Sequence, residues 1–319
     1  MKKSAVAAGL VAAVAFGAPA MAQTKPAIPV IVKDITSIYW QTVLAGARKA
    51  GQDFGVDVSA LGAQSETDVN GQISILEKAA ATHPAAIVIA PAGFALLGKA
   101  IDEAAKKVKI IGIDSAADTK ALTSLVATDR VLAGRIAADS LAAAITRTYA
   151  DTEGDVAVIT ASAGAASSDQ SATGFKAQVA DKYRALNVLP DQVGDAQAAS
   201  GVSIIKALVS ADRDLRGVFV SNAVMADGAS QTIYNKSGDR INYVVFGADD
   251  DLLKSVQDGT VAALVVQDPF RIGYESVKTA LAAANGEKVP ATVDTGVNVI
   301  TKANMNSARS QELLNPRIE

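Results

Sequence analysis

The residues best suited to ligand binding lie in one stretch, residues 30–41, which reads Val-Ile-Val-Lys-Asp-Ile-Thr-Ser-Ile-Tyr-Trp-Gln. It runs from an apolar strand through a polar loop, which carries Lys33 and Ser37, into a helix that starts near Tyr39 and Trp40. In an open parallel sheet such a loop lies at the carboxyl edge, where ligands bind. Polar groups beside a large flat ring suit a sugar or polyol, which has hydroxyls on its edges and C–H bonds on its faces. Alternatively, the two aromatic residues begin a helix and pack on the core.

Charge and composition exclude several other kinds of chemistry. The 319 residues carry a net charge of −3, which gives no electrostatic footprint for nucleic acid or for an anionic membrane. The chain has no cysteine, so a disulfide framework and a thiolate metal site are both excluded. Its one histidine, His83, precedes a proline and is better explained as a helix end than as a catalytic base. We therefore expect no enzyme activity, no metal and no cofactor.

The first residues have the pattern of an export signal. Lys2 and Lys3 precede a short apolar run at 5–17, and Ala-Met-Ala follows at 20–22. The apolar run is too short to span a bilayer comfortably, and no cysteine stands at the cleavage point for a lipid anchor. We expect cleavage after Ala22 and a soluble protein in the periplasm of a Gram-negative bacterium.

Short apolar runs alternate with helical patterns along the rest of the chain, which predicts parallel sheets covered by helices on both faces. The predicted strands lie at 29–32, 56–61, 86–90, 108–113, 155–159, 188–193, 217–221, 242–246 and 262–266. These are too many for one sheet of typical size, so we expect an α/β fold with two Rossmann-like lobes. A stiff hinge crossing is expected at 125–130, with a ligand cleft between the lobes. The expected parts are a signal peptide at 1–22, one lobe at 24–128 plus 267–296, and a second lobe at 129–266 plus 297–319.

Several short motifs occur together in a characteristic order. They are Ser-Ile-Tyr-Trp at 37–40, Gly-Ile-Asp at 112–114, Ala-Thr-Asp-Arg at 127–130, Gly-Phe at 174–175, Val-Phe-Val-Ser-Asn at 218–222, Phe-Gly-Ala-Asp at 246–249 and Val-Gln-Asp-Pro at 266–269. In this order and spacing the chain resembles the periplasmic sugar-binding proteins of ABC importers, the ribose-binding-like group of type I solute-binding proteins. The resemblance implies two lobes joined by a hinge, a monosaccharide or sugar-alcohol ligand, an ABC permease as partner, and a monomer.

The resemblance also implies a set of ligand-binding positions. Carried over residue by residue, they are Lys33, Ser37, Tyr39, Trp40, Asp114, Asn222, Asp249 and Gln267. Tyr39 and Trp40 fall where the family stacks a sugar ring, and Asp114 falls where it accepts hydrogen bonds from two neighbouring hydroxyls. A carboxylate suits this task because charged acceptors make shorter and stronger hydrogen bonds than neutral ones.

This sequence departs from the family pattern at three places. Ser171 stands where many members have arginine, Ala248 stands where ribose binders have an aromatic residue, and no aromatic residue occurs near 196–197. A pocket with one aromatic wall favours a linear polyol or a compact furanoid ligand over a simple pyranose. Asp169 and Gln170, together with Lys33 and Asp114, also resemble the pattern of binding proteins for the furanone quorum-sensing autoinducer.

Several alternatives remain open from the sequence. Lys33 either enters the pocket or pairs with Asp34 at the surface, and Gln267 either binds ligand or is a structural hinge residue. The three aspartates at 249–251 are better explained by a pocket carboxylate followed by a helix N-cap than by a cation site. For function, a transport receptor competes with a sensory protein that presents its ligand to a chemoreceptor or kinase. The effector core of a LacI-type repressor and an enzyme are disfavoured.

Overall fold

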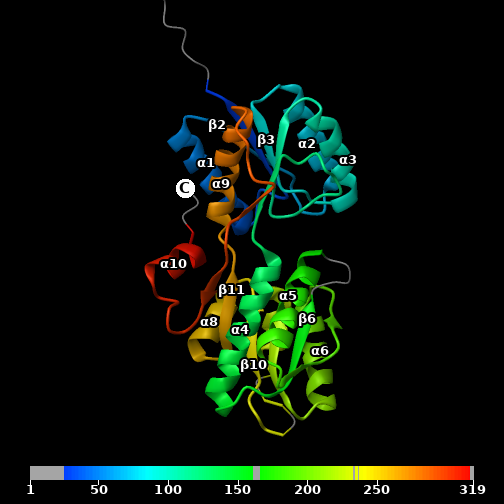
Figure 1. Cartoon of the computed structure of the whole chain (residues 1–319), viewed down its shortest axis with the longest axis vertical. Helices are drawn as coiled ribbons and strands as arrows, with labels where there is room; N and C mark the ends of the chain where they lie inside the picture. The colour runs from blue at the N-terminus through cyan, green and yellow to red at the C-terminus, as the bar shows by residue number, and fades with distance from the viewer. Residues whose placement is uncertain (1–24, 161–165, 233, 236, 317–319) are drawn as a thin grey trace, which may run out of the picture.

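The computed structural model describes residues 25–160, 166–232, 234–235 and 237–316, and it contains two separate β-sheets (Figure 1). The first sheet has the strand order β12-β5-β4-β3-β1-β2, and every pair in it is parallel. Its strands are β1 (Ala27–Val32), β2 (Asp57–Gly62), β3 (Ala86–Ile89), β4 (Lys109–Ile113), β5 (Ser124–Ala127) and β12 (Thr292–Asp294). On one face lie α1 (Ile38–Phe54) and α9 (Pro269–Ala284), and on the other lie α2 (Val69–Ala81) and α3 (Phe94–Ala105).

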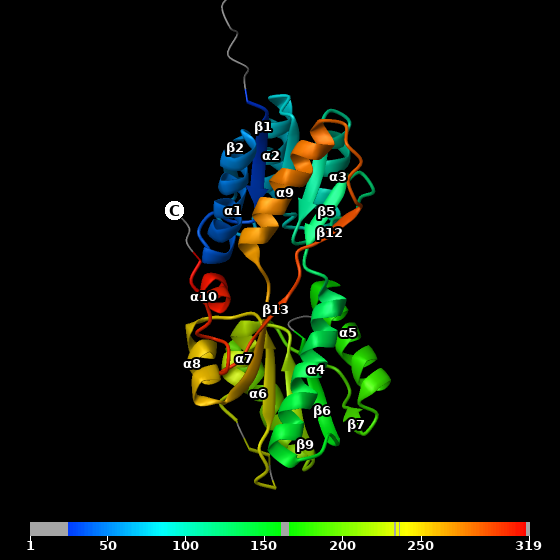
Figure 2. The same ribbon diagram turned by 60° about the vertical axis from the view of Figure 1, so that its left-hand side comes forward.

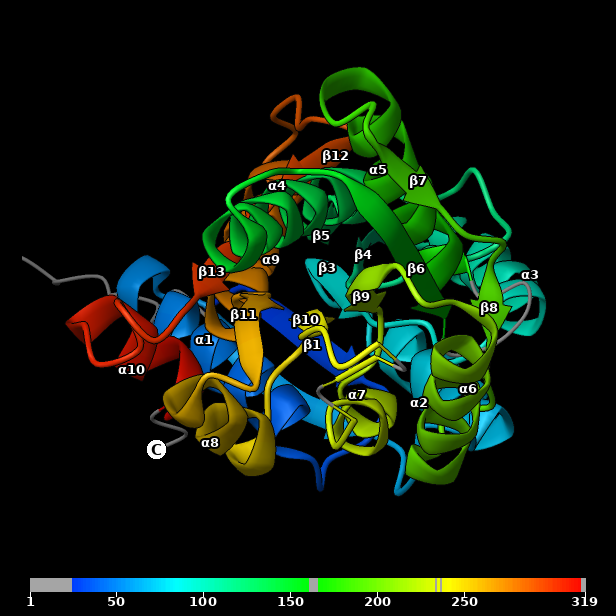
Figure 3. The ribbon, with the colours of Figure 1, turned by 90° about the horizontal axis from the view of Figure 1, so that it is seen from below.

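The second sheet has the order β13-β11-β10-β9-β6-β7, with β8 also paired to β6, and it is parallel except for β13. Its strands are β6 (Gly154–Thr160), β7 (Leu186–Val188), β8 (Gln192–Val193), β9 (Leu215–Val220), β10 (Asn242–Phe246), β11 (Val261–Val266) and β13 (Asn298–Ile300). Seen from below, α4 (Arg130–Tyr149) and α5 (Ala166–Lys182) cover one face (Figure 3). The other face is covered by α6 (Ala198–Ala211), α7 (Ala223–Ala229) and α8 (Asp250–Asp258), and α10 (Ala308–Leu314) lies at its edge.

The chain passes between the two sheets three times (Figure 2). The crossings lie between β5 and α4, between β11 and α9, and between β12 and β13. The second crossing returns the chain to the first lobe, where α9 packs. Each lobe is therefore built from segments that are far apart in the sequence. The contact of α9 with α1 is close: a β-carbon on Gly46 would lie 1.9 Å from the carbonyl oxygen of Phe270, and one on Gly273 would lie 1.8 Å from that of Val43.

The expected α/β fold with two parallel-sheet lobes is confirmed, and the buried strand runs explain why. Strands such as β3 and β10 are buried along their whole length, as expected for strands covered by helices on both faces. Two local predictions are wrong. Residues 125–127 belong to strand β5 rather than to the hinge crossing. The single strand expected at 188–193 is divided into β7 and β8, because Pro190 lacks the N–H that a continuous strand would need.

The predicted signal peptide and its cleavage point lie outside the described residues. Within the described part of the chain, no helix combines the length and the apolar character needed to cross a bilayer.

Candidate binding cleft

Two cavities lie side by side between the lobes and share Arg130 in their lining. The first, about 610 Å³, is lined from the first lobe by Tyr39 and from the second by Asn222, Phe246 and Asp249. The second, about 650 Å³, is lined by Lys33, Asp114, Ser115 and Gln170, among other residues. We refer to the two together as the cleft. Its walls are built from the carboxyl ends of strands in both sheets, where ligands of open parallel sheets bind.

On the first-lobe wall, three polar side chains form one connected network around Asp114, which directly follows β4. The Lys33 ammonium lies 3.0 Å from Oδ2 of Asp114 and donates to Ser115 Oγ at 2.7 Å. Ser115 Oγ donates to the same carboxylate oxygen at 2.8 Å, and the Tyr39 hydroxyl donates to Oδ1 at 2.9 Å. The Asp114 side chain is 8% exposed. The sequence placed Lys33, Tyr39 and Asp114 in the site, and the structure brings these three together.

The turn after β1 explains how Lys33 and Tyr39 reach Asp114. Oδ1 of Asp34 accepts hydrogen bonds from the backbone N–H groups of Thr36, at 2.7 Å, and Ser37, at 2.8 Å. Ser37 then caps α1 by accepting the N–H of Trp40 at 3.4 Å. The Asp34 carboxylate therefore stabilises the turn, whereas Lys33 pairs with Asp114. The alternative in which Lys33 pairs with Asp34 is wrong. Ser37 lies in the same loop, and its hydroxyl serves as a helix cap.

The charges around Asp114 oppose the effect of its burial. Burial by itself raises the pKa of a carboxyl group, but the nearby charges of Lys33 and Arg130 and the hydrogen bonds of Ser115 and Lys33 outweigh it, so the pKa of Asp114 lies below its usual value. Burial, followed by the negative charge of Asp114, raises the pKa of the Tyr39 phenol well above its usual value. At neutral pH, Asp114 is thus an ionised acceptor and Tyr39 a neutral donor.

Trp40 does not face the cleft, which corrects the prediction that it stacks on a ligand. Its side chain is 1% exposed and belongs to the core between α1 and the first sheet. Its indole N–H donates to Glu66, and its ring makes an edge contact with Tyr39 at 4.9 Å between centroids. The Lys33 ammonium lies over the Trp40 ring, 5.4 Å from its centroid, so the ring supports the cleft network from within the core.

On the second-lobe wall, the predicted residues lie at helix starts. Asn222 caps α7, its Oδ1 accepting the N–H of Met225 at 3.0 Å. Asp249 caps α8 by accepting the N–H groups of Asp251 and Leu252 at 3.1 and 2.8 Å. The cap is Asp249 itself rather than the residue after it. Among the described residues, no cluster of three or more His, Cys, Asp or Glu side chains could hold a metal.

Two buried oxygens on this wall have no hydrogen-bond partner within the described part of the chain. They are Oε1 of Gln267 and Oγ of Ser221, and both residues line the first cavity. An unpaired buried acceptor costs free energy, so these atoms suit a ligand that brings hydroxyl donors. Gln267 was predicted from the sequence, whereas Ser221 was missed.

Arg130 and Phe246 were also missed. The Arg130 guanidinium lies over the Phe246 ring, 4.4 Å from its centroid, and both residues line the first cavity. Phe246 therefore gives the second-lobe wall an aromatic residue, which the sequence pattern did not indicate. Phe246 could have been found from its position at the carboxyl end of β10, because the carboxyl ends of other parallel strands had already supplied candidate residues.

The remaining candidates are Asp169 and Gln170, on the first turn of α5. Both residues are exposed, but Gln170 lines the second cavity with Lys33 and Asp114, whereas Asp169 lines neither cavity. The structure thus brings together three of the four residues of the autoinducer-like pattern.

Comparison with known proteins identifies the family. Residues 28–288 match the family model described as "Periplasmic binding protein domain". The chain belongs to this family. This binding protein is 28% identical over 305 residues to the ribose import binding protein of Escherichia coli (strain K12), with 95% of this chain and 99% of that protein covered. The sequence-based resemblance is confirmed, and the family is one of binding proteins rather than enzymes.

Solved structures show the same fold. A carbohydrate transporter solute binding protein from Agrobacterium radiobacter, in complex with D-arabinose, is 55% identical to this binding protein, with a TM-score of 0.78 and coverage of 92% of this chain and 100% of that one. An ABC transporter solute binding protein from Agrobacterium vitis, bound with α-D-tagatopyranose, is 29% identical, with a TM-score of 0.76 and coverage of 91% and 99%.

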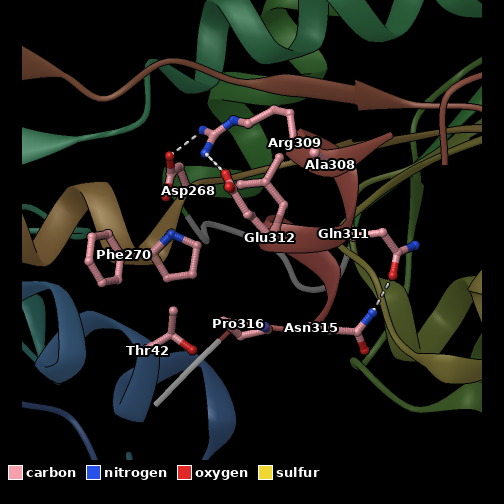
Figure 4. Close-up of a pocket in the computed structure, with 11 residues that line it drawn as sticks. Thr42, Asp268, Phe270, Ala308, Arg309, Gln311, Glu312, Asn315 and Pro316 are labelled. Carbon is pink, nitrogen blue, oxygen red and sulfur yellow. Dashed lines mark hydrogen bonds and ion pairs between the residues drawn. The ribbon is translucent and has the colours of Figure 1, made fainter. Parts of the chain in front are cut away.

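A third cavity, of about 740 Å³, lies beside the second crossing of the binding protein and is lined partly by α10 (Figure 4). Arg309 forms ion pairs there with Asp268 and Glu312, the latter at 3.6 Å. Asp268 is buried and also caps α9, its Oδ1 accepting the N–H of Arg271 at 2.9 Å. None of the predicted site residues lines this cavity, and its buried carboxylate already has partners, so the cleft is the better candidate site.

Proposed function

We propose that this binding protein captures a monosaccharide or sugar alcohol in the cleft and delivers it to an ABC permease. In this proposal it works as an exported periplasmic monomer. The two lobes close around the ligand. Their bounds, as expected from the sequence, are 24–128 with 267–296 and 129–266 with 297–319. The family and the carbohydrate-bound relatives support the ligand class, and the 55% identical relative makes D-arabinose the first candidate.

The observation that carries the proposal is the buried, ionised Asp114 held at the cleft by Lys33, Ser115 and Tyr39. A fixed carboxylate is a strong acceptor for a ligand hydroxyl. Tyr39 and Phe246 place apolar ring surface in the adjoining first cavity, which suits the C–H bonds of a sugar. Asn222, Asp249 and Gln267 add polar atoms from the second lobe.

The second candidate is a sensory binding protein for the furanone quorum-sensing autoinducer, which would present its ligand to a chemoreceptor or kinase. The grouping of Lys33, Asp114 and Gln170 around one cavity is the observation in its favour. The exposed Asp169, outside that lining, is the observation against it.

Thermal unfolding against a ligand panel tests both candidates. The protein is unfolded and refolded first, to remove any co-purified ligand. It is then heated with D-arabinose, D-ribose, D-tagatose, D-fucose, D-allose, galactitol or the autoinducer precursor. A ligand at about a hundred times its dissociation constant adds about 2.7 kcal/mol to the free energy of unfolding, which raises the midpoint by about 5 °C or more. A rise with one sugar or polyol supports the receptor, a rise with the furanone alone supports the sensor, and no rise contradicts both.

A further inference from the structure

Arg130 stands where the two cavities of the cleft meet, and it connects the two lobes. It is the first residue of α4, immediately after the first crossing, so it belongs to the second lobe. Asp114 follows β4 in the first lobe. The Nη2 atom of Arg130 lies 3.9 Å from Oδ1 of Asp114, and this approach spans the cleft from one wall to the other.

The Arg130 side chain is held in one orientation. Its guanidinium carbon lies 4.4 Å from the centroid of Phe246, which is 6% exposed at the end of β10. The Arg130 side chain itself is only 17% exposed. A guanidinium that lies on an aromatic ring presents its N–H donors as a fixed planar fork, which a lysine ammonium cannot reproduce.

The carboxylate of Asp114 has room for one more donor, and that position is on the Arg130 side. Oδ2 already accepts from Lys33 and Ser115, whereas Oδ1 accepts from Tyr39. A carboxylate oxygen accepts about two hydrogen bonds, so Oδ1 keeps one free position. A separation of 3.9 Å is too long for a direct hydrogen bond from Arg130. A hydroxyl oxygen placed beside the two atoms can nevertheless lie about 2.8 Å from each.

We propose that Arg130 is a specificity-determining residue that reads one ligand hydroxyl jointly with Asp114. That hydroxyl donates to Oδ1 of Asp114 and accepts from Nη2 of Arg130. It therefore joins the first lobe to the second, which gives the sugar a direct means of favouring closure. Phe246 is the positioning residue that holds the guanidinium. This inference rests on the proposed function, and it replaces the two hydroxyls expected at Asp114 with one.

The test combines a conservative variant with sugars that lack single hydroxyls. R130K keeps the positive charge but loses the planar fork. R147K, an exposed arginine on the same helix, is the matched control. Affinities are measured by calorimetry for D-arabinose and its monodeoxy derivatives, or for the panel sugar that the wild-type protein binds most tightly. We expect R130K to bind the intact sugar about tenfold more weakly, and R147K to bind as wild type does.

The decisive result is the dependence on one hydroxyl. For one monodeoxy sugar, the difference between wild type and R130K should vanish, because the hydroxyl that Arg130 reads is absent. An equal loss for every sugar, or no loss with R130K, would overturn the inference while leaving the receptor function intact. If the wild-type protein binds no sugar at all, the proposed function and this inference fail together. F246L is the second variant: it should weaken the intact sugar and spare the same monodeoxy sugar, and its unfolding midpoint without ligand shows whether it is folded.

Discussion

Asp114 on the first lobe and Asp227 on the second are both partly buried carboxylates, yet their pKa values shift in opposite directions. Lys33 and Arg130 lower the pKa of Asp114 despite its burial. For Asp227, burial and then the negative charges of Asp249 and Asp251 raise the pKa to about 6. The first-lobe carboxylate has cations beside it, whereas the second-lobe carboxylate has other carboxylates.

The two walls of the cleft differ in the same way, because only the first is already satisfied by its own hydrogen bonds. On the first lobe, Lys33, Ser115 and Tyr39 hold Asp114 in place before any ligand arrives. On the second lobe, the buried oxygens of Ser221 and Gln267 have no partner within the described residues. We expect the ligand to bind the preformed first-lobe wall, and the second lobe to gain its missing hydrogen bonds when it closes.

The largest effect is expected from D114N. This change removes the charged acceptor and leaves the Lys33 ammonium without its carboxylate, so sugar affinity should fall about a hundredfold or more. Calorimetric titration measures the loss, and D57N, at an exposed aspartate of β2, is the control. Similar affinities for D114N and D57N would contradict the role given to the first-lobe wall.

A smaller effect is expected from S221A on the second-lobe wall. Removing an unpaired buried hydroxyl should leave the ligand-free protein as stable as wild type or more stable, by up to about 1 kcal/mol. The same change should weaken sugar binding about fivefold, because the ligand loses an acceptor. Chemical denaturation and titration measure the two effects, with S203A on the exposed face of α6 as the control. Loss of stability without loss of affinity would mean that Ser221 is purely structural.

The D227N variant tests whether the pKa of Asp227 on the second lobe is raised. Because the pKa of Asp227 is raised in the folded protein, its charge destabilises the fold above about pH 6, and this cost disappears as the pH falls toward the ordinary value of 3.8. D227N should therefore be more stable than wild type at pH 7, by about 1 kcal/mol after allowance for solvent screening. The difference should shrink steadily down to about pH 4 in urea titrations. A difference that does not change with pH would disprove the raised pKa.

The smallest effect is expected from pH on binding itself. The pKa of Asp114 lies below the ordinary 3.8, so its carboxylate stays charged, and its contribution is lost only as the pH falls through that lowered value. Sugar affinity should therefore be nearly constant between about pH 8 and pH 5. A clear decrease in affinity within that range would show that a different group controls binding.

Local patterns predicted much of this molecule. Apolar runs identified the strands, and the polar residues that follow them, Lys33 and Asp114, meet because parallel strands end at one edge of the sheet. Trp40 was misplaced because its position beside Tyr39 in the sequence does not show that its ring is buried in the core under α1. Arg130 and Phe246 were not predicted because their contact joins the start of a helix to the end of a strand that is distant in the sequence. A local sequence pattern cannot indicate such a contact.

Hydrogen–deuterium exchange with and without D-arabinose tests the central claim most directly, since exchange reports local opening along the whole chain. We expect the sugar to slow exchange at 33–40 and 112–116 on the first-lobe wall and at 221–226 and 246–252 on the second. Protection on both walls would support capture between the lobes. Protection confined to 308–316, beside the cavity of Figure 4, or no protection under conditions where titration detects binding, would contradict the account.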